Sequence, residues 1–229
     1  MHTLSRFLFA GFLMTVALWG TGCQRIADRA YYNAYYSVWE KLGREKRDLL
    51  TSQLRKAVGE EEDLKEEFSD TLKKIREEYP FEEGRAAEVY DALAGDYENA
   101  REKSDALTKR LTAVRTIAAD LFYEWKSEAR QITDAGLRSK SQAQLKQSQE
   151  QFRMTNTHFE AAERQIQGVL QQLRNHVLFA KHNLNANAIA GLEQRLQTTE
   201  PEIENLLRKI QESIEAAERF EKQLTTPHS

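Results

Sequence analysis

Apolar residues recur at intervals of three and four along nearly the whole chain after residue 24. This spacing places the apolar side chains on one face of an α-helix. Only 3 prolines and 10 glycines occur among 229 residues, which is too few for a turn-rich β sandwich. The sequence therefore predicts an all-α fold.

Breaks in the apolar pattern divide the chain into four helical segments, at about 24–79, 85–132, 135–183 and from 185 to the C-terminal region. Pro80 should end the first segment, because a residue that precedes proline is driven out of the α region. In the second segment the apolar steps alternate between four and three. This heptad spacing is typical of left-handed coiled-coil packing.

Two residues are candidates to begin helices, and a third interrupts one. Asp134 and Asn185 each precede a periodic segment and are good N-cap residues. Pro201 falls within the fourth segment. Either it kinks a continuous helix, or it lies in the first turn of a new helix capped by Thr199. Both interpretations stay open at this point.

The four segments are long and their connections are short. At 1.5 Å per residue their lengths are roughly 80, 70, 75 and 60 Å. Short connections favour antiparallel neighbours, so we expect an elongated up-down-up-down four-helix bundle built from antiparallel coiled-coil hairpins. The expected register places Trp39 opposite Trp125, Leu54 opposite Leu111 and Leu173 opposite Leu196. No break in composition marks a domain boundary, so residues 23–229 are expected to form a single elongated domain.

The first 22 residues read as a targeting signal. Arg6 precedes an uncharged apolar run, which is too short to cross a bilayer comfortably. Small residues then lead to Cys23, and this resembles the lipobox of bacterial lipoproteins, in which the signal is cut before the cysteine and the thiol is acylated. The alternative is an ordinary signal peptide in which Cys23 is incidental. We favour lipidation, because a free exposed thiol is a liability in an oxidising compartment.

The residue after the cysteine bears on location. Gln24 stands there rather than aspartate. By analogy with lipoprotein sorting, this predicts a cell-envelope protein anchored to the outer membrane and facing the periplasm.

Composition limits the chemistry that the chain can perform. The net charge of −3 argues against a nucleic-acid partner. The single cysteine excludes an internal disulfide framework and every multi-cysteine metal site. No phosphate-binding glycine loop and no paired Glu-x-x-His motif occurs. The sequence therefore predicts no catalytic residue, no metal ligand, no cofactor and no enzymatic activity.

Two stretches have compositions that call for an explanation. Residues 31–39 hold four tyrosines and a tryptophan, which suit either the headgroup zone of a membrane or an aromatic plug at the end of the bundle. We favour the plug, because nine helical residues cover every face. Between the third and fourth segments lie His182, Asn183, Asn185 and Asn187. These residues are either an interaction tip or ordinary turn and capping residues, and the sequence supports both equally.

Three stretches together resemble one family. They are residues 31–50 with Trp39-Glu40-Lys41-Leu42-Gly43, residues 121–125, and residues 177–192 with Lys181-His182-Asn183-Leu184-Asn185-Ala186. They are similar to the bacterial family of unknown function DUF2959. The resemblance implies a secreted, coiled-coil-rich helical protein that is often lipid-anchored. It implies no activity and no catalytic residue.

These observations predict a non-enzymatic envelope lipoprotein. An acyl group on Cys23 would hold it at the membrane, and the bundle would act as a scaffold or adaptor for an envelope protein. The alternative is a periplasmic chaperone-like carrier that binds an apolar client between its helices. A carrier needs a wide apolar groove, and the narrow heptad seam favours the scaffold.

Overall fold

The computed structural model describes residues 46–82, 84–183 and 186–225. Contacts between Cα atoms divide the chain into two units, Met1–Glu45 and Lys46–Ser229. The signal peptide at residues 1–22, the acylation site Cys23 and the aromatic stretch at 31–39 lie outside the described residues. Those three interpretations stay predictions.

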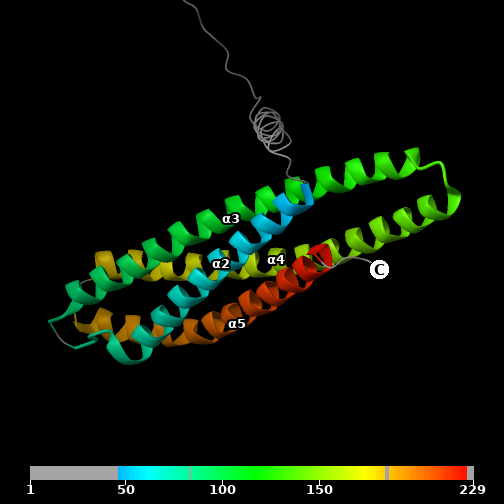
Figure 1. Ribbon diagram of the computed structural model, residues 1–229. Helices are drawn as coiled ribbons and strands as arrows, with labels where there is room; N and C mark the ends of the chain where they lie inside the picture. The colour runs from blue at the N-terminus through cyan, green and yellow to red at the C-terminus, as the bar shows by residue number, and fades with distance from the viewer. Residues whose placement is uncertain (1–45, 83, 184–185, 226–229) are drawn as a thin grey trace, which may run out of the picture. The chain divides into compact units, whose positions relative to one another are not determined.

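The described residues are helical and contain no strand, which confirms the all-α prediction. In chain order the elements are α2 (Lys46–Lys73), the π-helix η1 (Lys74–Glu78), α3 (Ala86–Gln131), α4 (Ala135–His182) and α5 (Ala186–Thr225). Their bounds follow the predicted segments closely within the described part of the chain. Helices α2 to α5 pack against one another (Figure 1).

The helix ends follow local chemistry. Tyr79, which precedes Pro80, has an extended backbone with φ −65° and ψ 127°, so the first helical segment ends where predicted. Gly84 has φ 87°, a left-handed conformation that favours glycine. Asp134 is the N-cap of α4, and its Oδ1 accepts a hydrogen bond from the Leu137 backbone N–H at 2.7 Å. Both predicted helix boundaries are confirmed.

Pro201 lies inside α5, which continues from Ala186 to Thr225. The interpretation in which Pro201 begins a new helix is therefore wrong. Thr199 does not cap a helix. Its hydroxyl donates to the Arg195 carbonyl at 3.3 Å, one turn back within the same helix. A proline is tolerated here although residue 201 can make no backbone hydrogen bond to Gln197.

The apolar residues of the predicted faces form the core. Each helix contributes large side chains that are fully or almost fully buried: Leu50, Leu54, Leu64 and Phe68; Leu93, Leu107, Leu111 and Ile117; Phe159, Ile166 and Leu173; Leu196, Ile203, Ile210 and Phe220. Replacing one of these leucines by alanine typically costs about 2–5 kcal/mol, because the cavity collapses only in part. These side chains are therefore the main contribution to stability.

Side-chain hydrogen bonds report the register between α2 and α3. Arg110 donates to Gln53 at 2.7 Å and to Glu60 at 2.9 Å, so residue 110 lies beside the segment 53–60. This agrees with the predicted pairing of Leu54 with Leu111. Further along, Lys103 donates to Glu67 at 2.6 Å. Residue numbers fall on α2 as they rise on α3.

The other neighbouring helices pair in the same sense. Between α4 and α5, Thr155 donates to the Ala216 carbonyl at 3.3 Å, and Gln165 donates to Glu202 at 2.9 Å. Between α2 and α5, Arg55 donates to Glu221 and Lys65 to Gln211; between α3 and α4, Arg115 donates to Asn156 and Trp125 to Ser141. The α4–α5 bonds agree with the predicted pairing of Leu173 with Leu196.

Trp125 lies near the end of α3 and is half-buried. Its Nε1 donates to Ser141 Oγ at 3.0 Å, and the Arg47 guanidinium lies over its ring, 5.5 Å from the centroid. The predicted partner Trp39 lies outside the described residues, so that pairing stays a prediction.

Candidate functional site

The last turn of the α2 segment is a π-helix, η1, rather than an α-helix. The Tyr79 backbone N–H donates to the Lys74 carbonyl at 2.8 Å, which is an i→i+5 bond. A π-turn is rare and is frequent at functional sites, because its extra residue changes the direction of the side chains that follow. This end of the helices is therefore a candidate functional region.

A buried aspartate on α3 holds η1 in place. Asp96 Oδ1 accepts from Lys74 Nζ and Asp96 Oδ2 accepts from the Tyr79 hydroxyl, each at 2.6 Å. Burial and the bond to Asp96 raise the pKa of Tyr79, and the same carboxylate raises the pKa of Lys74 through its hydrogen bond. Both partners therefore keep their protons near neutral pH, and the π-turn is fixed against α3.

On its other side, η1 faces the stretch of α5 around Pro201. Arg76 donates to Glu200 at 2.7 Å and to Glu204 at 2.5 Å. The two carboxylates are one turn apart on α5, so a single guanidinium spans them. Arg76 is partly exposed, so solvent screens both ion pairs and each contributes little to stability. Their main effect is to set the spacing between η1 and α5.

An open hollow of about 680 Å³ lies between these two elements. We name it the acidic hollow; its lining is Ile75, Arg76, Glu77, Tyr79, Phe81, Glu82, Glu193, Gln197, Glu200, Pro201 and Glu204. Tyr79 and Phe81 pack edge to face, with ring centroids 5.8 Å apart. The lining thus combines an apolar and aromatic part with five glutamates and one arginine.

The charges of the acidic hollow are not balanced. Arg76 already bridges Glu200 and Glu204, and Glu82 pairs with Arg85 at 3.3 Å. Within the described part of the chain, Glu77 and Glu193 make no ion pair. They come from opposite walls, η1 and α5. A cation beside the aromatic rings would be attracted both by the carboxylates and by the ring faces.

The structure describes only part of the predicted interaction tip, which stays a prediction. His182 is exposed at the end of α4. Asn183 is the C-cap of α4, where its Nδ2 donates to the Phe179 carbonyl at 2.9 Å and its backbone N–H to the Ala180 carbonyl at 3.2 Å. Its role in the structure is capping. Asn185 and the side chain of Asn187 lie outside the described residues, and neither His182 nor Asn183 lines the acidic hollow.

His176 lies on α4 and faces Thr199 of α5. Its Nε2 is 3.0 Å from Thr199 Oγ1, and burial, together with the charge of Arg195, lowers the pKa of His176. The imidazole is therefore neutral at neutral pH. In residues 46–82, 84–183 and 186–225, no group of three His, Cys, Asp or Glu residues is arranged to hold a metal ion.

The sequence interpretation missed the acidic hollow. A signal was present, because acidic and aromatic residues surround Pro80, and glutamates flank Pro201. Neither stretch is informative alone. Only the packing of η1 against α5 brings Glu77 and Glu193 to one hollow.

The structure defines a class, that of all-helical proteins with long packed helices and a surface hollow near the turns of two hairpins. The family model described as "Protein of unknown function (DUF2959)" matches residues 35–224, and the chain belongs to this family. The resemblance noted from the sequence is thereby confirmed. No curated protein and no solved structure matches the chain.

Proposed function

We propose that this protein is a lipid-anchored adaptor of the cell envelope without enzymatic activity. An acyl group on Cys23 holds it in the outer membrane, facing the periplasm, and residues 23–229 form one elongated domain. Its helices form an up-down-up-down bundle of coiled-coil hairpins that places the acidic hollow at a distance from the membrane.

The pairing of the helices supports this arrangement. In each neighbouring pair the bonded residues run in opposite directions along the two helices. The described chain begins at Lys46, which bonds to Glu124 near the end of α3, whereas Tyr79 bonds to Asp96 near its start. At 1.5 Å per residue, about 50 Å of helix separates Lys46 from Tyr79.

The acidic hollow is the single observation that carries the adaptor function. It lies at the end of α2 opposite to Lys46, and its lining is open to solvent in the described part of the chain. The glutamates that line it, together with its apolar and aromatic side chains, suit the binding of a partner through charge and apolar contact. Its unpaired carboxylates favour a partner segment that presents lysine or arginine beside an apolar side chain.

Photocrosslinking in living cells tests this proposal. A benzoylphenylalanine at Phe81, inside the hollow, should give a discrete crosslinked species, and the same group at the exposed Glu102 on α3 should not. The double substitution Glu77→Gln/Glu193→Gln should remove the species. The matched control Glu66→Gln/Glu218→Gln changes the charge equally at exposed sites away from the hollow and should leave it intact. Equal yields in both double variants would contradict a role of the hollow.

A buried carboxyl group favours the carrier as a second candidate. Glu61 on α2 faces Ser213 of α5, and one of its oxygens has no hydrogen-bond partner. An ionised carboxylate at this position would weaken the α2–α5 contact and open the helices to an apolar client. A carrier of this kind should bind an apolar fluorescent probe above pH 8 more strongly than at pH 6. Absence of probe binding at both values would exclude it.

A further inference from the structure

The α3–α4 hairpin continues beyond the beginning of α2. Lys46, the first residue of α2, bonds to Glu124, whereas α3 runs on to Gln131 and α4 begins at Ala135. Figure 1 shows this hairpin reaching past the first turn of α2 and the last turn of α5. The end of the hairpin is therefore not flanked by α2 and α5 as the rest of α3 and α4 is.

Cations converge on one side of this hairpin. Lys126 and Arg130 of α3 and Lys146 of α4 line a hollow of about 250 Å³, together with Gln142, Leu145 and Gln149. No carboxylate is among the lining residues that the structure describes. Within the described residues, none of the three cations forms an ion pair. Lys126 and Arg130 are four residues apart on one helix, where like charges repel each other.

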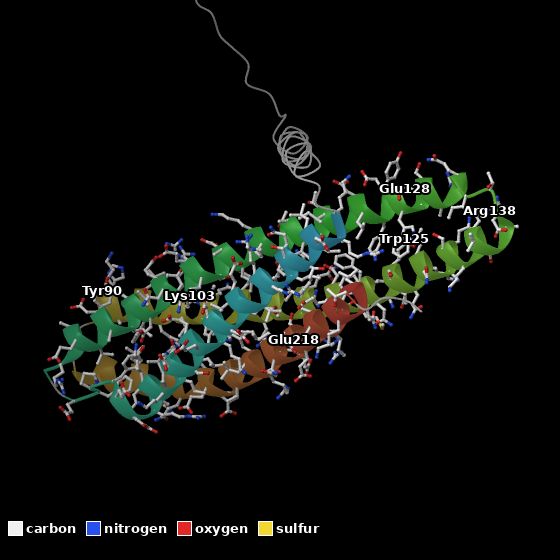
Figure 2. The ribbon with its side chains drawn as sticks, in the orientation of Figure 1. Tyr90, Lys103, Trp125, Glu128, Arg138 and Glu218 are labelled. Atoms are coloured by element: carbon white, nitrogen blue, oxygen red, sulfur yellow. The ribbon has the colours of Figure 1, made fainter. Side chains whose placement is uncertain are left out.

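The charge around this hollow extends to the turn of the hairpin. Between residues 126 and 149 there are five lysines and arginines and two acidic residues, a net charge of +3. One of the two acids, Asp134, is occupied in capping α4. Arg138 lies near the turn (Figure 2) and precedes Gln142 by one helical turn. Among the described residues, this surface therefore carries an excess of positive charge.

Two large apolar side chains are exposed on the same hairpin. Tyr123 is 76% exposed and Leu137, in the first turn of α4, is 63% exposed. Tyr123 precedes Lys126 by three residues and Arg130 by seven, so the three share one helix face. A single exposed apolar residue is ordinary. Exposed aromatic and aliphatic side chains combined with a cation cluster are typical of surfaces that contact lipid headgroups.

We propose that these residues form an anionic-lipid docking surface, in which Lys126, Arg130 and Lys146 bind headgroup phosphates and Leu137 enters the interface. Hereafter it is named the basic hairpin surface and comprises Tyr123, Lys126, Arg130, Leu137, Arg138 and Lys146. Charge complementarity identifies the occupant, because three cations in a hollow without a carboxylate match the phosphate of a lipid headgroup.

The length of chain between Cys23 and Lys46 is compatible with this docking. Twenty-two residues separate Cys23 from Lys46, and that length can span at most about 75 Å. Helix α3 extends only about 10 Å beyond Glu124 to its end at Gln131, at 1.5 Å per residue. A chain anchored at Cys23 can therefore bring the basic hairpin surface to the same membrane. The docking itself needs no acyl group and goes beyond the proposed adaptor function.

Vesicle co-sedimentation of the chain from Cys23 to Ser229, carrying Cys23→Ser so that no acyl group contributes, tests the proposal. It should bind vesicles of phosphatidylglycerol with phosphatidylcholine and should not bind vesicles of phosphatidylcholine alone. Each basic residue near an anionic surface contributes roughly fivefold in affinity. The triple variant Lys126→Gln/Arg130→Gln/Lys146→Gln should therefore bind about 100-fold more weakly.

A matched control removes the same charge elsewhere. Lys56, Lys109 and Lys181 are exposed on three different helices, and their triple change to glutamine should leave binding within a few-fold of the parent chain. Leu137→Ser should weaken binding to vesicles but not to inorganic phosphate. Equal losses in both triple variants would show a response to net charge alone, and binding of inorganic phosphate without vesicle binding would also overturn the proposal. Thermal unfolding of each variant checks that the fold is retained.

Discussion

Glu61 carries a carboxyl group into the packed interior between α2 and α5. The side chain is fully buried, and its Oε1 accepts a hydrogen bond from the Ser213 hydroxyl at 2.6 Å, while Oε2 has no partner. Burial raises the pKa of Glu61 to about 8, the Ser213 hydrogen bond opposes the rise, and the charge of Glu163 on α4 adds to it. The group is therefore mostly protonated at neutral pH.

This shift predicts a pH dependence of stability. The folded protein keeps a proton on Glu61 between its ordinary pKa of 4.5 and its folded pKa of about 8, whereas the unfolded chain has released it. Stability from this group is therefore fully present below pH 4.5, falls as the pH rises through that window, and stays constant above it. Glu61→Gln mimics the protonated form and should stabilise the protein at pH 9 by on the order of 2–4 kcal/mol.

Urea unfolding at pH 5 and pH 9 measures this effect. The gain from Glu61→Gln should be small at pH 5 and large at pH 9. Glu62→Gln alters the exposed neighbour and should change stability little at either pH. A gain for Glu61→Gln of the same size at both values would mean that the carboxyl group is not held protonated in the folded state.

At the scale of the elements, local sequence predicted the helices well. Periodic apolar residues, Pro80 and Asp134 were sufficient, because they act through backbone chemistry within one or two turns. Pro201 was ambiguous from the sequence, and in the structure it lies inside α5, which packs on α2 and α4. The π-turn of η1 was not predictable. It depends on Asp96, which lies about twenty residues later on α3.

The acidic hollow and the hollow of the basic hairpin surface were not predicted from the sequence, for the same reason. Glu77 and Glu193 share a hollow only because η1 packs on α5, and Lys126 and Lys146 share one only through the register of α3 with α4. The sequence interpretation instead drew attention to residues 182–187, where unusual composition was visible, and left an interaction tip and turn or capping residues equally open. In the structure Asn183 caps its own helix.

The hydrogen bonds that Asp96 accepts from Lys74 and Tyr79 give a prediction at the scale of the elements. Asp96→Ala should destabilise the protein by about 2–4 kcal/mol, because it leaves the buried Tyr79 hydroxyl without an acceptor and Lys74 without its counter-charge. It should also loosen η1 and abolish crosslinking from Phe81. Urea unfolding measures the first effect. Asp91→Ala, at an exposed position of the same helix, serves as the control and should change stability by less than about 0.5 kcal/mol.

At the scale of the whole molecule, charge is distributed unevenly along the helices of the described unit. The acidic hollow lies where α2 ends, and the basic hairpin surface lies where α3 meets α4, beyond the beginning of α2. A net charge of only −3 conceals this separation. In our proposal the basic side contacts the membrane, and the acidic hollow binds a partner on the periplasmic side.

This account depends most on attachment to the envelope through Cys23. Labelled palmitate supplied to cells should enter the parent protein and fractionate with it into the outer membrane. Cys23→Ala should take up no label, because the acylated thiol is absent. It should also leave the membrane fraction, because stable anchoring needs two or more lipid signals. Cys23→Ala that still carries label, or a parent protein without label, would contradict the lipoprotein assignment.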